Sequence, residues 1–288
     1  MIETKADPVK AELDARVVTR PNSFIFTLYA DFALGHGDEI PMRSLLTLMA
    51  EFGLSEQAVR QAVSRMSKQG WLRARRTGAR SFYALTARGI RRIKTIGPRV
   101  YEPAEEWDGR WRLLTYTVSE TIRESRDRLR KDLRVLGFAP LCASTWISPR
   151  EASGAAREAA NAAGLGSRID LFTAEYRGPM GDHELLRKCW NVDAIAQAYG
   201  EFIERYQSRV RFERKAATLS NEAAFVERLW LVHDFRRFAY IDPGLPSVLL
   251  PAHWAGSIAS SLFRQYYQII SSRATQFYNR ALADAGKA

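Results

Sequence analysis

The chain has 288 residues, of which 46% are hydrophobic and 26% are charged, as is typical of a soluble globular protein with two or three domains. It lacks an uncharged apolar run of eighteen or more residues, and its N-terminal sequence mixes acids with bases. We therefore expect neither a membrane-spanning helix nor a secretory signal, and we expect a cytoplasmic protein.

The positive charge is concentrated in one segment. The formal net charge is +11, and residues 57–101 hold twelve basic and no acidic residues. The rest of the chain has 31 basic against 32 acidic residues. Acids normally intersperse a solvated basic face, so this segment indicates a polyanionic partner, because clustered Lys and Arg release counterions when they neutralise phosphates.

The N-terminal third has the pattern of a helix-turn-helix. The apolar run FIFTLYADFAL predicts a first helix that ends before the Gly-His-Gly at 35–37. Pro41 precedes a second helix, which Gly53 ends. Ser55 is a favourable N-cap for a third helix over 56–69. The last two helices, joined by a short glycine-containing turn, have the required spacing.

The helix predicted over 56–69 is amphipathic. Projected at 100° per residue, Val59, Ala62, Val63 and Met66 lie on one side and would pack on the preceding helices. The other positions carry side chains that can contact DNA bases or phosphate: Gln57, Arg60, Gln61, Ser64, Arg65 and Lys68. An ordinary amphipathic surface helix has the same pattern, so this helix alone leaves both interpretations open.

The next segment favours the DNA-binding interpretation. Strands are predicted over 71–76 and 80–85, joined through Gly78, which suits a tight hairpin. Arginines surround its tip: Arg75, Arg76 and Arg80. Thr86 then caps a further basic helix. Three helices and a basic hairpin form a winged helix, so we predict that residues 20–99 bind double-stranded DNA.

The remaining sequence predicts an α+β region followed by helices. Gly97-Pro98, Pro103 and Glu105-Glu106 indicate a linker. Strands over 111–118, 141–147 and 169–176 alternate with a charged helix over 121–135 and an Ala- and Gly-rich helix, which predicts a small α+β domain over 107–180. Residues 185–285 are mainly helical, and their aromatic residues favour a core or a dimer interface over a cofactor pocket. The overall fold class is α+β.

Specific motifs then make the chain recognisable. LVHDFRRF, DPGLP and LLPAHWAG, within residues 231–263, resemble the PaaX family of repressors of phenylacetic acid catabolism. RPNSFIFTLYADF, the helix and hairpin described above, and WDGRWRLLTYTV extend the resemblance over roughly residues 20–270. The resemblance implies a homodimeric repressor that is released from its operator by phenylacetyl-CoA or a related acyl-CoA. It also implies a ferredoxin-like middle domain similar to a CRISPR-associated nuclease subunit.

The C-terminal motif contains residues that could bind the implied effector. An acyl-CoA site needs apolar or aromatic walls and basic residues near the phosphates. The candidates are His233, Arg236, Arg237, Tyr240, His253 and Trp254. For His233 and Trp254 a role in the core is an alternative, and Arg236 has Asp234 and Asp242 nearby as ion-pair partners.

We predict neither catalysis nor a metal. Glu120 follows the first strand of the middle domain without a second carboxylate, which is a poor site for a nuclease metal ion. The four histidines and the two cysteines, Cys142 and Cys189, have no metal-binding spacing, and we expect buried thiols. Two alternatives stay open: an RNA-binding or nuclease-like protein, and a regulator without an acyl-CoA effector.

Overall fold

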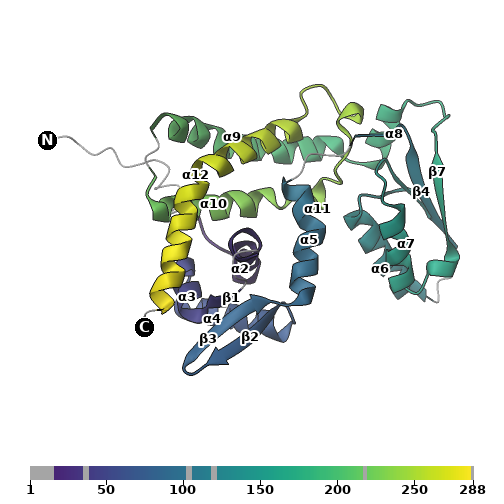
Figure 1. The fold of residues 1–288 in the computed structure, drawn as a ribbon. Coiled ribbons are helices and arrows are strands. Elements are labelled where there is room, and N and C mark those ends of the chain that lie inside the picture. The colour runs from purple at the N-terminus through teal and green to yellow at the C-terminus, as the bar shows by residue number, and fades with distance from the viewer. Residues whose placement is uncertain (1–15, 35–38, 102–105, 118–121, 217–218, 287–288) are drawn as a thin grey trace. The chain divides into compact units, whose positions relative to one another are not determined.

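The computed structural model describes residues 16–34, 39–101, 106–117, 122–216 and 219–286 (Figure 1). They form two compact units. The first unit comprises the described parts of Met1–Pro98, Phe202–Arg236 and Ser260–Ala288. The second comprises those of Arg99–Glu201 and Arg237–Ala259. The fold is α+β, as predicted.

The first unit contains the winged helix. Its elements are α2 (Pro21–Leu28), which continues as the π-helical turn η1 (Tyr29–Ala33), β1 (Glu39–Pro41), α3 (Met42–Ala50), α4 (Glu56–Lys68), β2 (Leu72–Thr77), β3 (Arg80–Leu85) and α5 (Ala87–Tyr101). The strands form an antiparallel sheet in the order β1-β3-β2. The predicted helices and hairpin are confirmed. Strand β1 was not predicted, because three residues ending in a proline have no recognisable strand pattern.

Local interactions explain where these elements begin and end. The Ser55 hydroxyl accepts a hydrogen bond from the Ala58 amide at 3.3 Å and caps α4. Gly78 has a φ of +57° at the hairpin tip, a conformation that favours glycine. The Thr86 hydroxyl accepts from the Gly89 amide at 3.2 Å and donates to the Gly70 carbonyl at 2.7 Å, which joins the end of the hairpin to the end of α4.

The boundary predicted at Gly97-Pro98 coincides with the division between the two units, which falls after Pro98, but the segment is not an irregular linker, because α5 continues through both residues to Tyr101. Proline removes one helical donor and is costly inside a helix, yet a single proline does not forbid one. Of the other predicted linker residues, Pro103 and Glu105 lie outside the described residues, and Glu106 is exposed and belongs to neither a helix nor a strand.

C-terminal helices complete the core of the first unit. They are α9 (Val192–Ala216) and α12 (Ala255–Gly286), each of which contributes to both units, and α10 (Asn221–Phe235). Helix α10 lies against α2 (Figure 1), and the ring centroids of Phe24 and Trp230 are 4.7 Å apart. The Ser44 hydroxyl in α3 donates to the Ala281 carbonyl in α12 at 2.9 Å. The winged helix therefore shares one hydrophobic core with the C-terminal helices.

The second unit contains the predicted ferredoxin-like domain. It consists of β4 (Trp111–Tyr116), α6 (Arg123–Val135), β5 (Ala139–Cys142), β6 (Thr145–Ser148), α7 (Ser153–Ala162), the short η3 (Gly166–Arg168) and β7 (Ile169–Ala174). The sheet is antiparallel in the order β5-β6-β4-β7, the ferredoxin-like arrangement of a βαββαβ chain. Helices α6 and α7 cover one face (Figure 1), where Leu114 and Trp146 pack against Leu129 and Ala156.

Two predictions for this region are wrong. The single strand predicted over 141–147 is a hairpin, because Ala143 and Ser144 form a turn between β5 and β6. Cys142 is exposed at the end of β5, an edge strand, and Cys189 is only half-buried. Edge position explains the exposure of Cys142, which the sequence pattern does not reveal.

Short helices complete the second unit: α8 (Asp182–Cys189), α11 (Phe238–Ile241) and η4 (Ser247–Leu249). The Trp111 indole donates to Asp182 at 2.7 Å, and its ring stacks on Trp190 with centroids 6.4 Å apart. These contacts attach α8 and the start of α9 to strand β4. In the described part of the chain, none of the helices is long and apolar enough to span a bilayer.

Candidate nucleic-acid interface

Helix α4 presents its polar face to solvent. Val59, Ala62, Val63 and Met66 are buried, as the helical projection predicted. The six side chains predicted to contact DNA are all exposed: Gln57, Arg60, Gln61, Ser64, Arg65 and Lys68. Burial of the opposite face anchors the helix to the module, so the exposed face is available to a partner.

Two arginines of α4 make contacts that orient them. Arg60 pairs with Glu56 one turn earlier, with nitrogen and oxygen 3.3 Å apart and both side chains largely exposed. The Arg65 guanidinium donates to the Asn22 amide oxygen in α2 at 3.2 Å. Exposed pairs of this kind are weak, so both guanidinium groups can exchange these partners for phosphate or base atoms.

The hairpin β2–β3 distributes its arginines over two faces. Cross-strand pairing places Arg75 opposite Phe82 and Arg76 opposite Ser81, so successive residues point to opposite sides. The Arg75 guanidinium stacks over Phe82, 4.5 Å from the ring centroid. Arg76 and Arg80 are exposed near the tip. The predicted basic wing therefore offers cations on both sides of a narrow ribbon.

Glu39 is a functional candidate that the sequence pattern did not reveal. Its carboxylate in β1 accepts from Arg75 Nε at 2.8 Å and lies 3.5 Å from Arg73 Nη1. The hydrogen bond from Arg75 lowers the pKa of Glu39, so the carboxylate stays charged at neutral pH. Glu39 thus offsets part of the positive charge of the wing, and a contact between residues 36 positions apart requires the pairing of β1 with β3.

Two of the six candidate effector residues belong to the first unit. Burial lowers the pKa of His233 to about 4, and its Nδ1 lies 3.0 Å from the Thr27 hydroxyl in α2. The Arg236 guanidinium donates to the Ser23 hydroxyl in the same helix. His233 is a hydrogen-bonded residue at the junction of α10 and α2.

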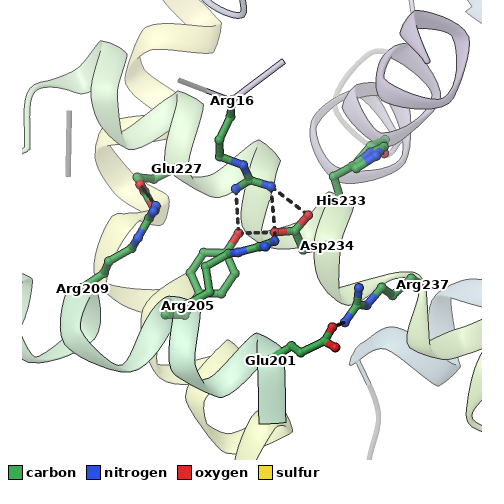
Figure 2. A network of polar contacts seen from close by, with 10 residues as sticks. Arg16, Glu201, Arg205, Arg209, Glu227, His233, Asp234 and Arg237 are labelled. Atoms are coloured by element: carbon green, nitrogen blue, oxygen red, sulfur yellow. Dashed lines mark hydrogen bonds and ion pairs between the residues drawn. The ribbon is translucent and has the colours of Figure 1, made fainter. Parts of the chain in front are cut away.

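Figure 2 shows the neighbouring polar network around Asp234. The Asp234 carboxylate accepts from Arg16 at 2.8 Å, from Arg205 at 3.1 Å and from the Tyr206 hydroxyl at 2.8 Å. Arg209 and Glu227, drawn in the same view, form a buried ion pair (Figure 2). This network ties α9 and α10 to the described start of the chain, so it has a structural role.

The other four candidate effector residues belong to the second unit. Arg237 is exposed and donates to the Ala198 carbonyl at 2.9 Å. Trp254 is buried edge-on against Tyr199, whereas His253 is exposed with a φ of +61°. Tyr240 is 49% exposed.

Each unit has a cavity that is lined by described residues. One, of about 520 Å³, lies in the first unit beside Phe52 and Trp230. The other, of about 460 Å³, lies in the second unit beside Trp190 and Tyr240. Of the six candidates only Tyr240 lines either cavity, so the structure does not gather the six around one of them.

Among the described residues, no group of three or more His, Cys, Asp or Glu side chains is arranged to hold a metal ion. Glu120, the carboxylate considered for a nuclease site, lies outside the described residues. The basic surface with side chains suited to DNA is therefore the best-defined functional feature.

A winged helix with an exposed polar recognition helix, fused to further domains, defines a DNA-binding regulator. Comparisons with known proteins agree with this class. Residues 20–89 match the model described as PaaX-like protein, residues 104–186 the PaaX protein central Cas2-like domain, and residues 190–280 the PaaX-like protein C-terminal domain.

The chain belongs to the PaaX family. It is 34% identical over 261 residues to the transcriptional repressor PaaX of Escherichia coli strain K12, covering 88% of this chain and 82% of that protein. The same fold occurs in the uncharacterized protein Rv0674 from Mycobacterium tuberculosis, with a TM-score of 0.57 and 23% identity over 90% of this chain and 99% of that one.

Proposed function

We propose that the protein is a transcriptional repressor that acts in the cytoplasm on genes for the catabolism of phenylacetate-type aromatic acids. It binds operator DNA as a homodimer and leaves it when an aryl acyl-CoA such as phenylacetyl-CoA binds. The observation that carries the DNA-binding part is the exposed polar face of α4 beside the basic hairpin. Membership of the PaaX family supports the role as a repressor.

In this mechanism, two copies of α4 enter successive major grooves of a pseudo-palindromic operator. Their half-site centres then lie about one helical turn apart, about 34–36 Å, or a multiple of it. Gln57 and Arg60 lie on the exposed side of the N-terminal half of α4, the end that usually meets base edges. The hairpin arginines contribute sequence-independent phosphate contacts.

Two kinds of variant separate these roles. Arg60→Ala or Gln57→Ala should relax specificity at one base position per half-site, at a cost of about 1–3 kcal/mol. Arg76→Ala should weaken binding to all sequences alike and should reduce the slope of log K against log salt by about 1. Both kinds of variant binding like the wild type in footprinting would refute the assignment of α4 as recognition helix.

Release requires that the effector binds the DNA-free form more tightly than the DNA-bound form. Effector and operator then weaken each other's binding by the same factor. Isothermal titration of phenylacetyl-CoA, with and without operator, tests this reciprocity. Equal affinities in the two titrations would exclude release by this ligand.

The experiment that tests the whole proposal is an operator titration. DNA upstream of the protein's own and neighbouring genes is titrated alone, with phenylacetyl-CoA and with free phenylacetate. We expect specific binding that the thioester abolishes and the free acid does not. Binding unchanged by the thioester would leave a DNA-binding regulator without this effector.

A further inference from the structure

The two cavities differ in charge. The 520 Å³ cavity of the first unit is lined by two carboxylates, Glu51 and Glu222, and by Arg16. The Arg16 guanidinium already pairs with Asp234 at 2.8 Å and stacks over Trp230 at 3.7 Å. Burial raises the pKa of Glu51, and Glu222 raises it further. Because its cation is already paired and two carboxylates lie beside it, this lining is unfavourable for a ligand with several negative charges.

The 460 Å³ cavity of the second unit has the opposite character. Arg134, at the end of α6, is its one charged lining residue among the described side chains. Cys189 also lines it, and burial raises the pKa of its thiol, which keeps the sulfur neutral at pH 7. A cation beside neutral walls suits a ligand that combines an apolar part with an anionic part.

Aromatic and aliphatic side chains form the walls of this cavity. Phe138 and Trp190 are buried, as is Ile195 in the first turn of α9. Tyr240 and Ile241, from α11, complete the lining and are 49% and 44% exposed. Tyr240 and Ile241 therefore leave apolar surface exposed beside buried aromatic side chains.

We propose that this cavity holds the acyl end of the effector, with Trp190, Ile195 and Tyr240 against the aryl or other apolar acyl group and Arg134 near an anionic part of the carrier. The inference rests on the proposed function and assigns its effector site. A cavity of about 460 Å³ is within the range of small-molecule sites. It can accommodate an aryl acyl group and part of the carrier arm, and it leaves the phosphates outside, toward the exposed Arg134.

The elements around the cavity also lead into the DNA-binding unit. Helix α9 begins at the cavity and continues beyond Phe202 into the first unit, and α11 follows directly on α10. Helix α10 packs on α2 of the winged helix. Ligand contacts with α9 and α11 therefore act on two of the covalent connections between the units, which is where a ligand can favour one arrangement over another.

The test fills the cavity without disturbing the core. Ala194 lines the cavity and is exposed on α9, so Ala194→Trp adds bulk there at little cost to packing. Gln197→Trp, one turn later, is the matched control, because Gln197 is exposed and does not line the cavity. Arg134→Gln removes the cation, and Lys131→Gln removes a charge from the same helix outside the cavity.

Phenylacetyl-CoA binding to the full-length variants is measured by isothermal titration calorimetry, and operator binding without thioester shows that each variant is folded. We expect Ala194→Trp to weaken thioester binding roughly tenfold or more, and Arg134→Gln to weaken it about fivefold. Both controls should bind within about twofold of the wild type. Release from the operator should then need correspondingly more thioester in the two cavity variants.

The outcomes separate the site from the function. Wild-type protein that binds operator but no phenylacetyl-CoA would refute the proposed effector, and the site with it. Wild-type and Ala194→Trp proteins that bind the thioester equally would refute the site alone. Equal thioester binding together with a changed dimer dissociation constant in sedimentation would instead place a second copy of the chain on this surface.

Discussion

Replacing Arg228 by methionine tests whether the winged helix depends on the C-terminal helices. Arg228 in α10 pairs with Asp31 in η1 at 2.8 Å, and their side chains are only 7% and 1% exposed. It also donates to Thr275 at 3.0 Å and to Tyr267 at 2.6 Å, both in α12. One guanidinium group thus links three helices that lie far apart in the sequence.

The expected loss follows from the burial of the partner. Methionine retains much of the apolar volume, but it leaves the Asp31 carboxylate buried with the Tyr267 hydroxyl, at 2.8 Å, as a remaining donor. Breaking a buried pair in this way costs about 3–5 kcal/mol. For a protein of this size the melting temperature should fall by about 6–20 °C. Adding Asp31→Asn should recover part of the loss, because the residual buried charge is removed.

Arg205→Met is the matched control. Arg205 pairs with Asp234 at 3.1 Å but is 44% exposed, and Asp234 retains Arg16 and Tyr206 as donors. Its loss should cost less than about 1 kcal/mol. Thermal unfolding followed by near-ultraviolet circular dichroism measures all variants. A melting temperature for Arg228→Met within about 2 °C of the control, or no recovery in the double variant, would refute the reasoning.

Three further predictions concern the wing and the core. Glu39→Gln removes the charge that pairs with Arg75. In an anisotropy titration on non-specific duplex DNA, the slope of log K against log salt should therefore become steeper by about 1. An unchanged slope would contradict a role of Glu39 in charge balance. His233, whose pKa burial lowers from 6.5 to about 4, contributes stability above pH 6.5 that is lost as the pH falls toward 4. The free energy of unfolding in urea should decrease by about 2 kcal/mol more between pH 7 and pH 5 in the wild type than in His233→Gln, and equal decreases would argue against a buried neutral histidine. Gly78→Ala should cost about 1–2 kcal/mol from its φ of +57° alone, because nothing lies within 4 Å of the added Cβ; urea unfolding at an unchanged midpoint would exclude that strain.

Local sequence was sufficient where one helix or one turn decides the structure. The buried face of α4 follows from apolar residues at helical spacing, and its start follows from the capping Ser55. The hairpin follows from Gly78 between two short strands. The same features determined which residues of α4 are exposed, and hence the candidate DNA-contacting residues.

Helix α10 shows why the rest was not predictable. All its residues from Ala224 to Val232 are buried, so this stretch of the helix has no polar stripe to show which face meets a neighbour. Its sequence predicts a helix and a core, but it does not show that the core is that of the winged helix. Only the contacts with α2, such as Phe24 on Trp230, decide that.

The candidate effector residues are distributed over both units for a related reason. Proximity in sequence suggested that His233, Arg236 and Tyr240 share a site, but a helix turns successive side chains to different sides. His233 lies against α2. Tyr240, in α11, lines the same cavity as Trp190, which comes about 50 positions earlier in the sequence.

The sequence by itself determined the basic segment, the winged helix, the α+β fold class and the family, because each depends on local pattern or on motif identity. The tertiary structure alone decided the pairing of Glu39 with the wing, the common core of α2 and α10, and the lining of the cavity beside Trp190. Those features depend on contacts between residues far apart in the chain. The hydrophobic periodicity of one segment does not show which distant segment it packs against.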